Sequence, residues 1–218
     1  MAKYLIHSCK DRYWYVRYYL IPSLKKQGIP KEDIIVYNDD NKEGLLTSFI
    51  KSYDYIGDED AWHLQDDIVL SKDFKKVADA HDTGIVCGFC NSFSRGNPGY
   101  VCLWNMWYSM PCIRIPGDIL RNFIVWLKEP ATQRRLKVYF EDNKHDDVLF
   151  EIFLREQYPH IRVGNVSPNM VNHIDHLIGG SLVNKDRNKK LSEVMSTYWG
   201  EPEVLIDVEQ RLKKRRDK

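Results

Sequence analysis

Two adjacent carboxylates interrupt an otherwise apolar, strand-like run over residues 61–70, and this feature constrains the fold more than any other. Asp is depleted in strands and an unpaired buried charge is costly, so Asp66 and Asp67 predict a strand end that opens onto a cation or a ligand. Because side chains alternate along a strand, Gln65 and Asp67 would share one face and Asp66 would point to the other, unless the strand breaks there. The competing interpretation is an exposed turn in which one of the two acids caps the next helix, although Ser71 is a better cap.

The chain begins with a pattern typical of a βαβ unit. Lys3–His7 predicts a first strand, an apolar helical pattern follows, and Asp33–Tyr37 predicts a second strand. Pro22 must kink or divide the helix between them. Strands connected through a helix run parallel, and ligands gather at the carboxyl ends of such strands. The polar loops after the two strands, over residues 8–12 and 38–41, are therefore candidate binding loops.

The rest of the chain continues to alternate between helical and strand patterns. Further helices are expected near residues 42–52, 74–78, 119–127 and 146–154, and further strands near 62–65, 84–89, 100–107, 113–116 and 161–163. This order predicts an α/β domain with a central sheet flanked by helices. We expect the domain to cover residues 1–200, followed by a charged helix or tail over 201–218.

Composition argues against several classes of function. Lys and Arg number 32 and Asp and Glu 31, so a formal charge of +1 provides no broad attraction to nucleic acid. The basic run over residues 211–218 is better explained as a solvated helix end than as a nucleic-acid or membrane arm. Five cysteines without paired C-x-x-C spacing favour reduced thiols over zinc. With no signal-like apolar start and no run of about 18 apolar residues, we expect a cytoplasmic protein without a membrane span.

A second acidic pair, Asp146 and Asp147, opens a predicted helix. Carboxylates at this position are explained by capping and by the helix dipole alone. A carboxylate at a helix start is also rigidly aimed, as a general base must be. Both interpretations stay open from the sequence.

Metal chemistry is expected where Asp67, with Asp66 or Gln65 beside it, meets one of two late histidines, His173 or His176. Carboxylates with one imidazole and water suit Mn²⁺ or Mg²⁺ better than zinc, which draws on Cys and more His. Such an ion neutralises charge that builds on a departing diphosphate. The residues are therefore consistent with a reaction in which a bond between a sugar and a nucleoside diphosphate breaks and a hydroxyl group accepts the sugar.

Four short motifs, taken in order, resemble a small GT-A glycosyltransferase of the kind found in bacteria and phages. They are Ser8–Arg12 after the first strand, the strand end Tyr37–Asp40, the central Leu64–Asp67 and the late Pro168–Ile174, and together they span most of residues 3–183. The resemblance implies a single GT-A-like (Rossmann-like) α/β domain with a mixed, mainly parallel sheet. It also implies a UDP-sugar donor and a divalent ion, Mn²⁺ or Mg²⁺.

The resemblance assigns binding roles to individual residues. Ser8 and Arg12, together with Asp39, would hold the nucleotide. Asp67 would be the main metal ligand and Asp66 would support it.

Two departures from the family pattern concern the metal shell. Gln65 stands where such motifs carry an acid, so either a water replaces that ligand or the ribose contact is made differently. His173 fits the late Val-Asn-His-Ile pattern and would complete the shell, whereas His176 would be structural or contact a phosphate.

The family's acceptor-side carboxylate falls on Asp146 or Asp147. The mechanism expected from it is inverting transfer, in which this carboxylate deprotonates an acceptor hydroxyl as UDP leaves. The acceptor would be a hydroxymethylated base in phage DNA, or a glycan or glycolipid. Residues 134–137 and the basic tail could meet DNA phosphates locally.

Two other classes of function compete with glycosyl transfer. A nucleotidyltransferase also needs strand-end carboxylates and a metal, but such enzymes open with a Gly-rich phosphate loop, and no glycine lies between Ser8 and Arg12. A non-catalytic sugar- or nucleotide-sugar-binding protein would bind ligand without releasing UDP.

Overall fold

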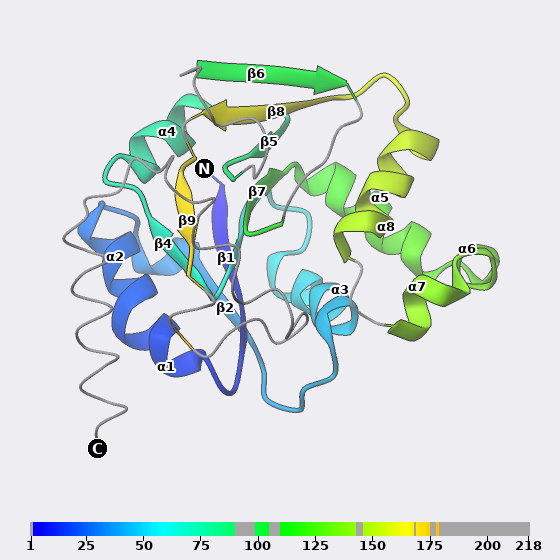
Figure 1. Ribbon diagram of the computed structural model, residues 1–218, viewed down its shortest axis with the longest axis horizontal. Helices are drawn as coiled ribbons and strands as arrows, with labels where there is room; N and C mark the ends of the chain where they lie inside the picture. The colour runs from blue at the N-terminus through cyan, green and yellow to red at the C-terminus, as the bar shows by residue number, and fades with distance from the viewer. Residues whose placement is uncertain are drawn as a thin grey trace.

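The computed structural model describes residues 2–89, 99–104, 110–142, 146–167, 169–174 and 178, which form an α/β domain (Figure 1). The expected tail over 201–218, and His176, lie outside the described residues. None of the helices in the described part of the chain has the length and apolar character needed to cross a membrane.

One large sheet forms the centre of the domain, and a small two-stranded sheet lies beside it. The large sheet has the order β2-β1-β3-β7-β5-β8-β6 and the small one pairs β4 with β9. The strands are β1 (Lys3–Cys9), β2 (Ile34–Asp39), β3 (Ala61–Gln65), β4 (Ile68–Leu70), β5 (Ile85–Cys87), β6 (Gly99–Trp104), β7 (Cys112–Ile115), β8 (Arg162–Ser167) and β9 (Val171–His173).

Most strands of the large sheet point the same way. β1 pairs parallel with both β2 and β3, and β5 pairs parallel with β8. β7 lies antiparallel between β3 and β5, so these two share a direction, and β6 is antiparallel to β8. The sheet is therefore mixed and mainly parallel, which confirms the predicted fold class.

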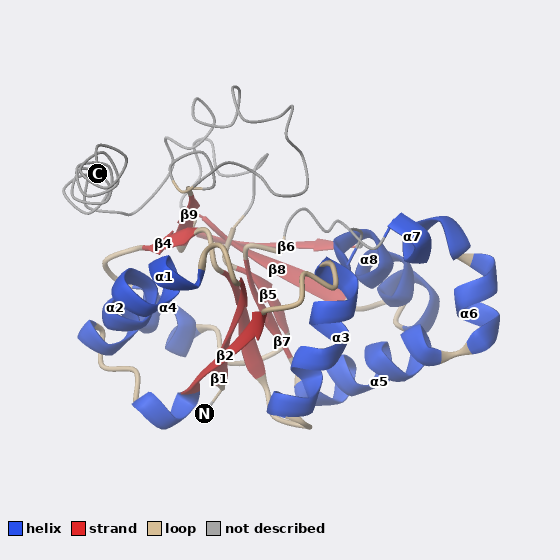
Figure 2. Cartoon of the chain, turned by 90° about the horizontal axis from the view of Figure 1, so that it is seen from below, coloured by secondary structure: helices blue, strands red, loops and turns tan. Residues whose placement is uncertain are grey.

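Helices cover both faces of the large sheet. Figure 2 shows α1, α2 and α4 on one side and α3, α5 and α8 on the other. The helical segments are α1 (Tyr13–Tyr15), the π-helix η1 (Val16–Leu20), α2 (Ile21–Lys26), the 3₁₀ helix η2 (Lys31–Asp33), α3 (Leu45–Ile56), α4 (Phe74–Ala80), α5 (Gly117–Lys128), α6 (Pro130–Arg135), α7 (Lys137–Asp142) and α8 (Asp146–Gln157).

Each face of the sheet has its own apolar core. On the face covered by α3, α5 and α8, an aromatic cluster joins the helices, because the Phe123 ring lies 4.9 Å from Phe150, 5.1 Å from Phe153 and 5.9 Å from Phe49 between centroids. Aromatic side chains of this size bury large apolar areas and dominate core stability. This cluster fixes the position of α8, whose first residue is Asp146.

Pro22 divides the first helical segment, as predicted. Without a backbone N–H it cannot continue the regular hydrogen-bond ladder. The N–H of Ile21 instead reaches the carbonyl of Val16, five residues back, and the intervening turn is a π-helix. Such π-turns are frequent at functional sites, and only the short helix α1 separates this one from the candidate loop over residues 8–12.

The prediction that Ser71 caps a helix is wrong. α4 begins at Phe74 after an N-cap at Asp73, and no side chain caps it by a hydrogen bond. Ser71 contributes only its backbone carbonyl, which accepts a bond from the Phe74 N–H at 3.2 Å. Because the helix starts this late, neither Asp66 nor Asp67 caps it, and the competing interpretation of the acidic pair is excluded.

Candidate functional site

The strand that leads to the acidic pair ends at Gln65, where the sequence predicts it to end. Asp66 and Asp67 form a turn, after which the chain leaves the large sheet as β4 and pairs with β9. The turn breaks the alternation of side chains, so both carboxylates contact the same partner instead of facing opposite ways. Both aspartates are buried, with 6% and 5% of their surface exposed.

That shared partner is Arg12, from the loop that follows β1. Its Nη1 donates to Asp66 Oδ1 at 3.1 Å and also to Asp67 Oδ2. Arg12 is itself only 5% exposed, so these ion pairs are shielded from water and are stronger than surface pairs. The backbone N–H of Cys9 donates to the other oxygen of Asp66 at 3.1 Å, which holds the end of β1 against the turn.

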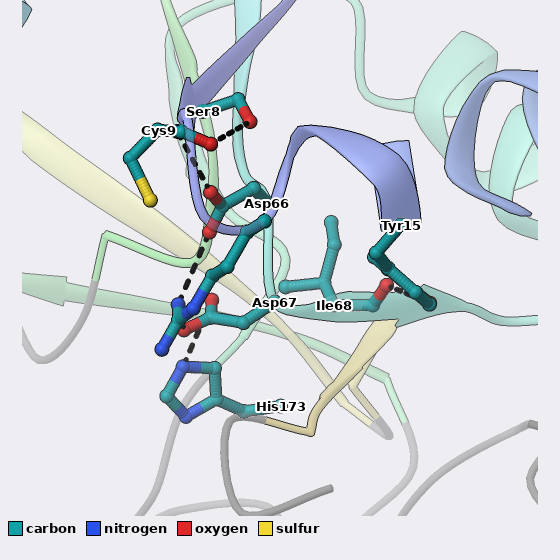
Figure 3. Close-up of polar contacts among 8 residues, drawn as sticks. Ser8, Cys9, Tyr15, Asp66, Asp67, Ile68 and His173 are labelled. Atoms are coloured by element: carbon teal, nitrogen blue, oxygen red, sulfur yellow. Dashed lines mark hydrogen bonds and ion pairs between the residues drawn. The ribbon is translucent and has the colours of Figure 1, made fainter. Parts of the chain in front are cut away.

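Strand β9 brings His173 to the acidic pair. His173 lies opposite Ile68 in the β4–β9 pairing, and the next backbone N–H, from Ile174, donates to the Asp67 carbonyl at 2.7 Å. The His173 Nε2 lies 3.0 Å from Asp67 Oδ1 (Figure 3). The structure therefore joins the two residues that the sequence analysis selects as metal ligands.

The backbone around Arg12 is tied to the same strand. The Tyr15 hydroxyl donates to the Ile68 carbonyl at 2.8 Å (Figure 3), and the Tyr15 N–H donates to the Arg12 carbonyl at 2.8 Å. The Tyr15 ring also stacks on Tyr19, with centroids 5.4 Å apart. These contacts anchor the backbone next to Arg12 to the strand β4.

Burial and charge act in opposite directions on the acidic pair. Burial and the neighbouring Asp67 raise the pKa of Asp66 to about 6, although Arg12 and the Cys9 N–H oppose the shift. Burial alone would also raise the pKa of Asp67, but His173 and Arg12 outweigh it and hold that pKa below its ordinary value. Burial would lower the pKa of Arg12, and the two carboxylates raise it instead. The pKa of each of these three side chains therefore depends on the charges of the others.

The donor set of Asp67 and His173 is compatible with a divalent ion that takes few protein ligands. No group of three or more His, Cys, Asp or Glu side chains forms a ready metal site in the described part of the chain. Mg²⁺ commonly takes only one or two protein carboxylates and completes its shell with substrate phosphates and water. Asp67 supplies one such carboxylate, and the His173 imidazole, 3.0 Å from it, lies close enough to be a second ligand of the same ion.

The predicted nucleotide residues Ser8 and Gln65 lie at the same edge of the sheet. Ser8 is buried near the end of β1, where its hydroxyl donates to the Cys9 carbonyl at 3.4 Å. Gln65 is half-buried at the end of β3, and its N–H donates to the Pro111 carbonyl at 3.0 Å. Among the described residues, no hydrogen bond joins either side chain to Arg12, so the contact these two make with nucleotide stays a prediction.

Asp39, the third predicted nucleotide residue, holds the start of α3. Its carboxylate accepts hydrogen bonds from the N–H of Glu43 at 3.0 Å, from the N–H of Gly44 at 3.4 Å and from the Ser48 hydroxyl at 2.9 Å. Burial alone would raise the pKa of Asp39, but these hydrogen bonds outweigh it and lower the pKa. A nucleotide that contacts Asp39 would have to bind carboxylate oxygens that already accept hydrogen bonds.

Replacing Asp39 with alanine is expected to lower the free energy of unfolding by about 1–3 kcal/mol at pH 7, because the donors that now bond to its buried carboxylate would lose their acceptor. The pKa of Asp39 is lowered in the folded protein, so its contribution is present above the unfolded pKa and is lost as the pH falls through the folded one. Urea unfolding from pH 7 to pH 3 measures this. An equal difference between variant and wild type at both pH values would contradict the role of the ionised Asp39 carboxylate as a hydrogen-bond acceptor.

The predicted base residues, Asp146 and Asp147, lie in the first turn of α8. Asp146 is 4% exposed, and burial together with Asp147 raises its pKa to about 7. Asp147 is half-buried, and its Oδ1 accepts the Val148 N–H at 2.8 Å. No hydrogen bond or ion pair between described residues links either acid to Arg12 or to His173.

Sequence reasoning missed a pair of adjacent histidines, half-buried His7 and buried His63. His7 on β1 and His63 on β3 are 3.1 Å apart between Nε2 and Nδ1, and both rings stack with Phe49 at 5.4 Å. Burial lowers the pKa of His7 to about 4 and also lowers that of His63, so both are neutral at pH 7. No sequence spacing signals this pair, because only the pairing of two separate strands brings the rings together.

Comparison with known proteins assigns no family. No family model matches the sequence, and no curated protein matches it. Among solved structures, protein A197 from STIV is 19% identical, with 79% of this chain and 85% of that chain covered and a TM-score of 0.41. A UDP-glucose pyrophosphorylase from Acinetobacter baumannii is 9% identical over 94% of this chain and 74% of its own, with a TM-score of 0.41.

A third structure, an apo UDP-glucose pyrophosphorylase, is 12% identical over 98% of this chain and 82% of its own, with a TM-score of 0.46. All three TM-scores lie below 0.5 and all three identities below 20%. Likeness at this level does not assign an activity, so the functional proposal for this chain rests on the cluster of Arg12, Asp66, Asp67 and His173.

Proposed function

We propose that the chain is a metal-dependent enzyme of nucleotide-sugar chemistry and, more narrowly, a glycosyltransferase that moves a sugar from a UDP-sugar to an acceptor hydroxyl. The observation that carries this proposal is the 3.0 Å contact between Asp67 and His173. Arg12 joins that contact at the carboxyl ends of the parallel strands β1 and β3. In open α/β sheets, ligands bind at this edge.

The cluster has the groups that a nucleoside diphosphate requires. The guanidinium of Arg12 matches the geometry of phosphate oxygens and recognises them in a bidentate manner. Asp67 and His173 would hold Mn²⁺ or Mg²⁺, with support from Asp66. When bound, such an ion neutralises the charge on the leaving diphosphate.

Asp146 is the better candidate for the general base of the two acids in α8. A base works best when its pKa lies near the working pH, and burial raises the pKa of Asp146 to about 7. Asp147 is more exposed and accepts a backbone hydrogen bond at the helix start. In the proposed inverting reaction, Asp146 takes the proton of the acceptor hydroxyl while the sugar bond to UDP breaks.

The proposal specifies the acceptor only as a hydroxyl group. A hydroxymethylated DNA base would need cations for the neighbouring phosphates, but Arg135 is paired with Glu156 at 2.5 and 2.8 Å and Lys137 with Glu141 at 3.2 Å. These two residues therefore give no reason to favour DNA over a glycan or glycolipid. Transfer assays with each acceptor class, at low and raised salt, distinguish them, because DNA contacts weaken steeply with salt.

Thermal unfolding against a panel of nucleotide sugars, with and without Mn²⁺, tests the donor. A donor at 100 times its Kd stabilises a protein by about 2.7 kcal/mol, which is roughly 5–10 °C in Tm for a domain of this size. We expect this shift from a UDP-sugar with Mn²⁺ and not from the same sugar without the nucleotide. The absence of any shift across the panel at millimolar donor and Mn²⁺ would overturn the proposal.

The identity of the released product separates the remaining classes of function. Glycosyl transfer releases UDP, and nucleotidyl transfer run backwards consumes pyrophosphate and releases UTP. A binding protein releases neither product. Chromatography of the nucleotides after incubation with UDP-sugar, Mn²⁺ and either acceptor or pyrophosphate therefore decides between these classes, and UDP is the product that we expect.

A further inference from the structure

The positively charged guanidinium of Arg12 already contacts the carboxylates that are proposed to bind the metal ion. The Arg12 guanidinium contacts Asp66 Oδ1 at 3.1 Å and contacts Asp67 Oδ2, while His173 takes the other oxygen of Asp67 at 3.0 Å. All three members of the Arg12–Asp66–Asp67 cluster are at least nine-tenths buried. Both oxygens of Asp67, the main proposed ligand, are thus engaged before any ion binds.

We propose that Arg12 acts as an internal substitute for the metal ion, so that a divalent ion and a nucleoside diphosphate bind this site only together. The inference rests on the metal site that the proposed function assigns to Asp67 and His173. It goes beyond that function because it defines when the site accepts an ion. Arg12 is a positioning residue in this role, since it acts through Asp66 and Asp67.

The reason is electrostatic. An ion bound to Asp67 with Arg12 still in place would put three positive charges against two carboxylates in a buried cluster, where repulsion between like charges is poorly screened. An Arg12 that moved away without a new partner would leave a guanidinium unpaired, and burying an unpaired charge is strongly unfavourable. Neither state is stable in the absence of an anion.

A diphosphate removes both obstacles. Its oxygens offer Arg12 a partner at least as good as a carboxylate, and the vacated carboxylates then face the incoming ion. The hydrogen bonds of Tyr15 hold the backbone at Arg12, so the change of partner would be made by the Arg12 side chain. Because coupling between two ligands is reciprocal, UDP must raise the affinity for Mn²⁺ by the same factor as Mn²⁺ raises that for UDP.

The test measures Mn²⁺ binding by electron paramagnetic resonance on the full chain, with Mn²⁺ alone and with Mn²⁺ plus UDP. In the wild type we expect UDP to tighten Mn²⁺ binding at least tenfold. In Arg12→Gln, which removes the substitute cation, Mn²⁺ alone should bind at least tenfold more tightly than it binds the wild type. Arg17→Gln is the matched control, because Arg17 is an exposed arginine that lies over the Tyr18 ring, and it should behave like the wild type.

If Arg12→Gln does not fold, the variant Arg12→Lys provides a second test. Lysine keeps the charge but lacks the planar fork that bridges two carboxylates, so Mn²⁺ alone should bind this variant about threefold or more tightly than the wild type. Equal Mn²⁺ affinity of the wild type and the folded Arg12 variants, without UDP, would overturn the inference. Asp67→Asn in the Arg12→Gln background should abolish the gain, and a gain that survives would also overturn it because the ion would lie elsewhere.

The inference and the proposed function fail in different ways. If UDP-sugar is turned over with Mn²⁺ while the Arg12 variants bind Mn²⁺ alone no better than the wild type, the inference is wrong and the function stands. If Arg12→Gln binds Mn²⁺ through Asp67 but the wild type neither binds nor turns over any nucleotide sugar, the enzymatic proposal is wrong. The substitute role of Arg12 would then survive without it.

Discussion

Replacing Asp67 with asparagine is expected to reduce sugar transfer by about a thousandfold. A bound ion provides several kcal/mol of charge stabilisation in the transition state, and a loss of about 4 kcal/mol corresponds to this factor. Asparagine is nearly the same size but removes the negative charge that holds the ion. UDP release at saturating donor and Mn²⁺ measures the effect.

Two further measurements separate catalysis from folding in Asp67→Asn. The substitution also removes an ion pair with Arg12 and one with His173, so urea unfolding of the variant should show a reduced stability. Asp82→Asn, at an exposed position, is the control and should retain full activity and stability. A folded Asp67→Asn variant within tenfold of the wild-type rate, or a wild type active in excess chelator, would contradict the metal role of Asp67.

Replacing Asp146 with asparagine should have opposite effects on activity and stability. As the proposed general base, Asp146 is expected to contribute about 10²–10⁴-fold to kcat, with little effect on donor KM. The same carboxylate is buried, and its ionised form is disfavoured in the folded protein. Neutral asparagine avoids that cost, so the variant should be nearly inactive and more stable than the wild type at pH 8.

The raised pKa of Asp146 fixes the pH range of both effects. Its pKa is raised from 3.8 to about 7 on folding, so its contribution to stability is complete below about pH 4, decreases between pH 4 and 7, and is lost above pH 7. A shift of about three units corresponds to at most about 4 kcal/mol, which bounds the advantage of Asp146→Asn above pH 7. The wild-type rate should rise with pH and level off above about pH 7, where the base is ionised.

Urea unfolding and kcat between pH 5 and 8.5 measure these effects together. Glu151→Gln, on the same helix, is the control: Glu151 pairs with Arg155 on the surface, and its loss should change the rate and stability little. An Asp146→Asn variant with full activity would remove Asp146 as the base. A loss of stability at pH 8 would show that the carboxylate is ionised and well paired in the folded protein.

The sequence was sufficient to predict the outer frame of the fold. The βαβ start, the division at Pro22 and the strand ending at Gln65 all follow from local signals: apolar periodicity, a missing N–H and a change from apolar to acidic residues. Such signals act within a few residues along the chain, which is why the sequence alone reveals them. The contact between Asp67 and His173 was also expected, through the order of motifs along the chain.

The remaining features depend on contacts distant in sequence. The last expected strand covers residues 161–163, whereas the structure extends β8 to Ser167 and adds the strand β9 that presents His173. The helices α6 and α7 were not predicted, because their short segments have no long apolar period. The bridge from Arg12 to both aspartates was missed because a break in β3, and not strand alternation, sets where Asp66 and Asp67 point.

The most direct test of the central claim is whether an imidazole of this chain binds the ion that carries the nucleotide. Pulsed electron paramagnetic resonance of the Mn²⁺–UDP complex reports nitrogen nuclei bonded to the manganese. We predict nitrogen modulation from one histidine in the wild type and its loss in His173→Gln. A Mn²⁺–UDP complex that shows no nitrogen modulation, or modulation that persists in His173→Gln, would contradict the placement of the metal site at Asp67 and His173.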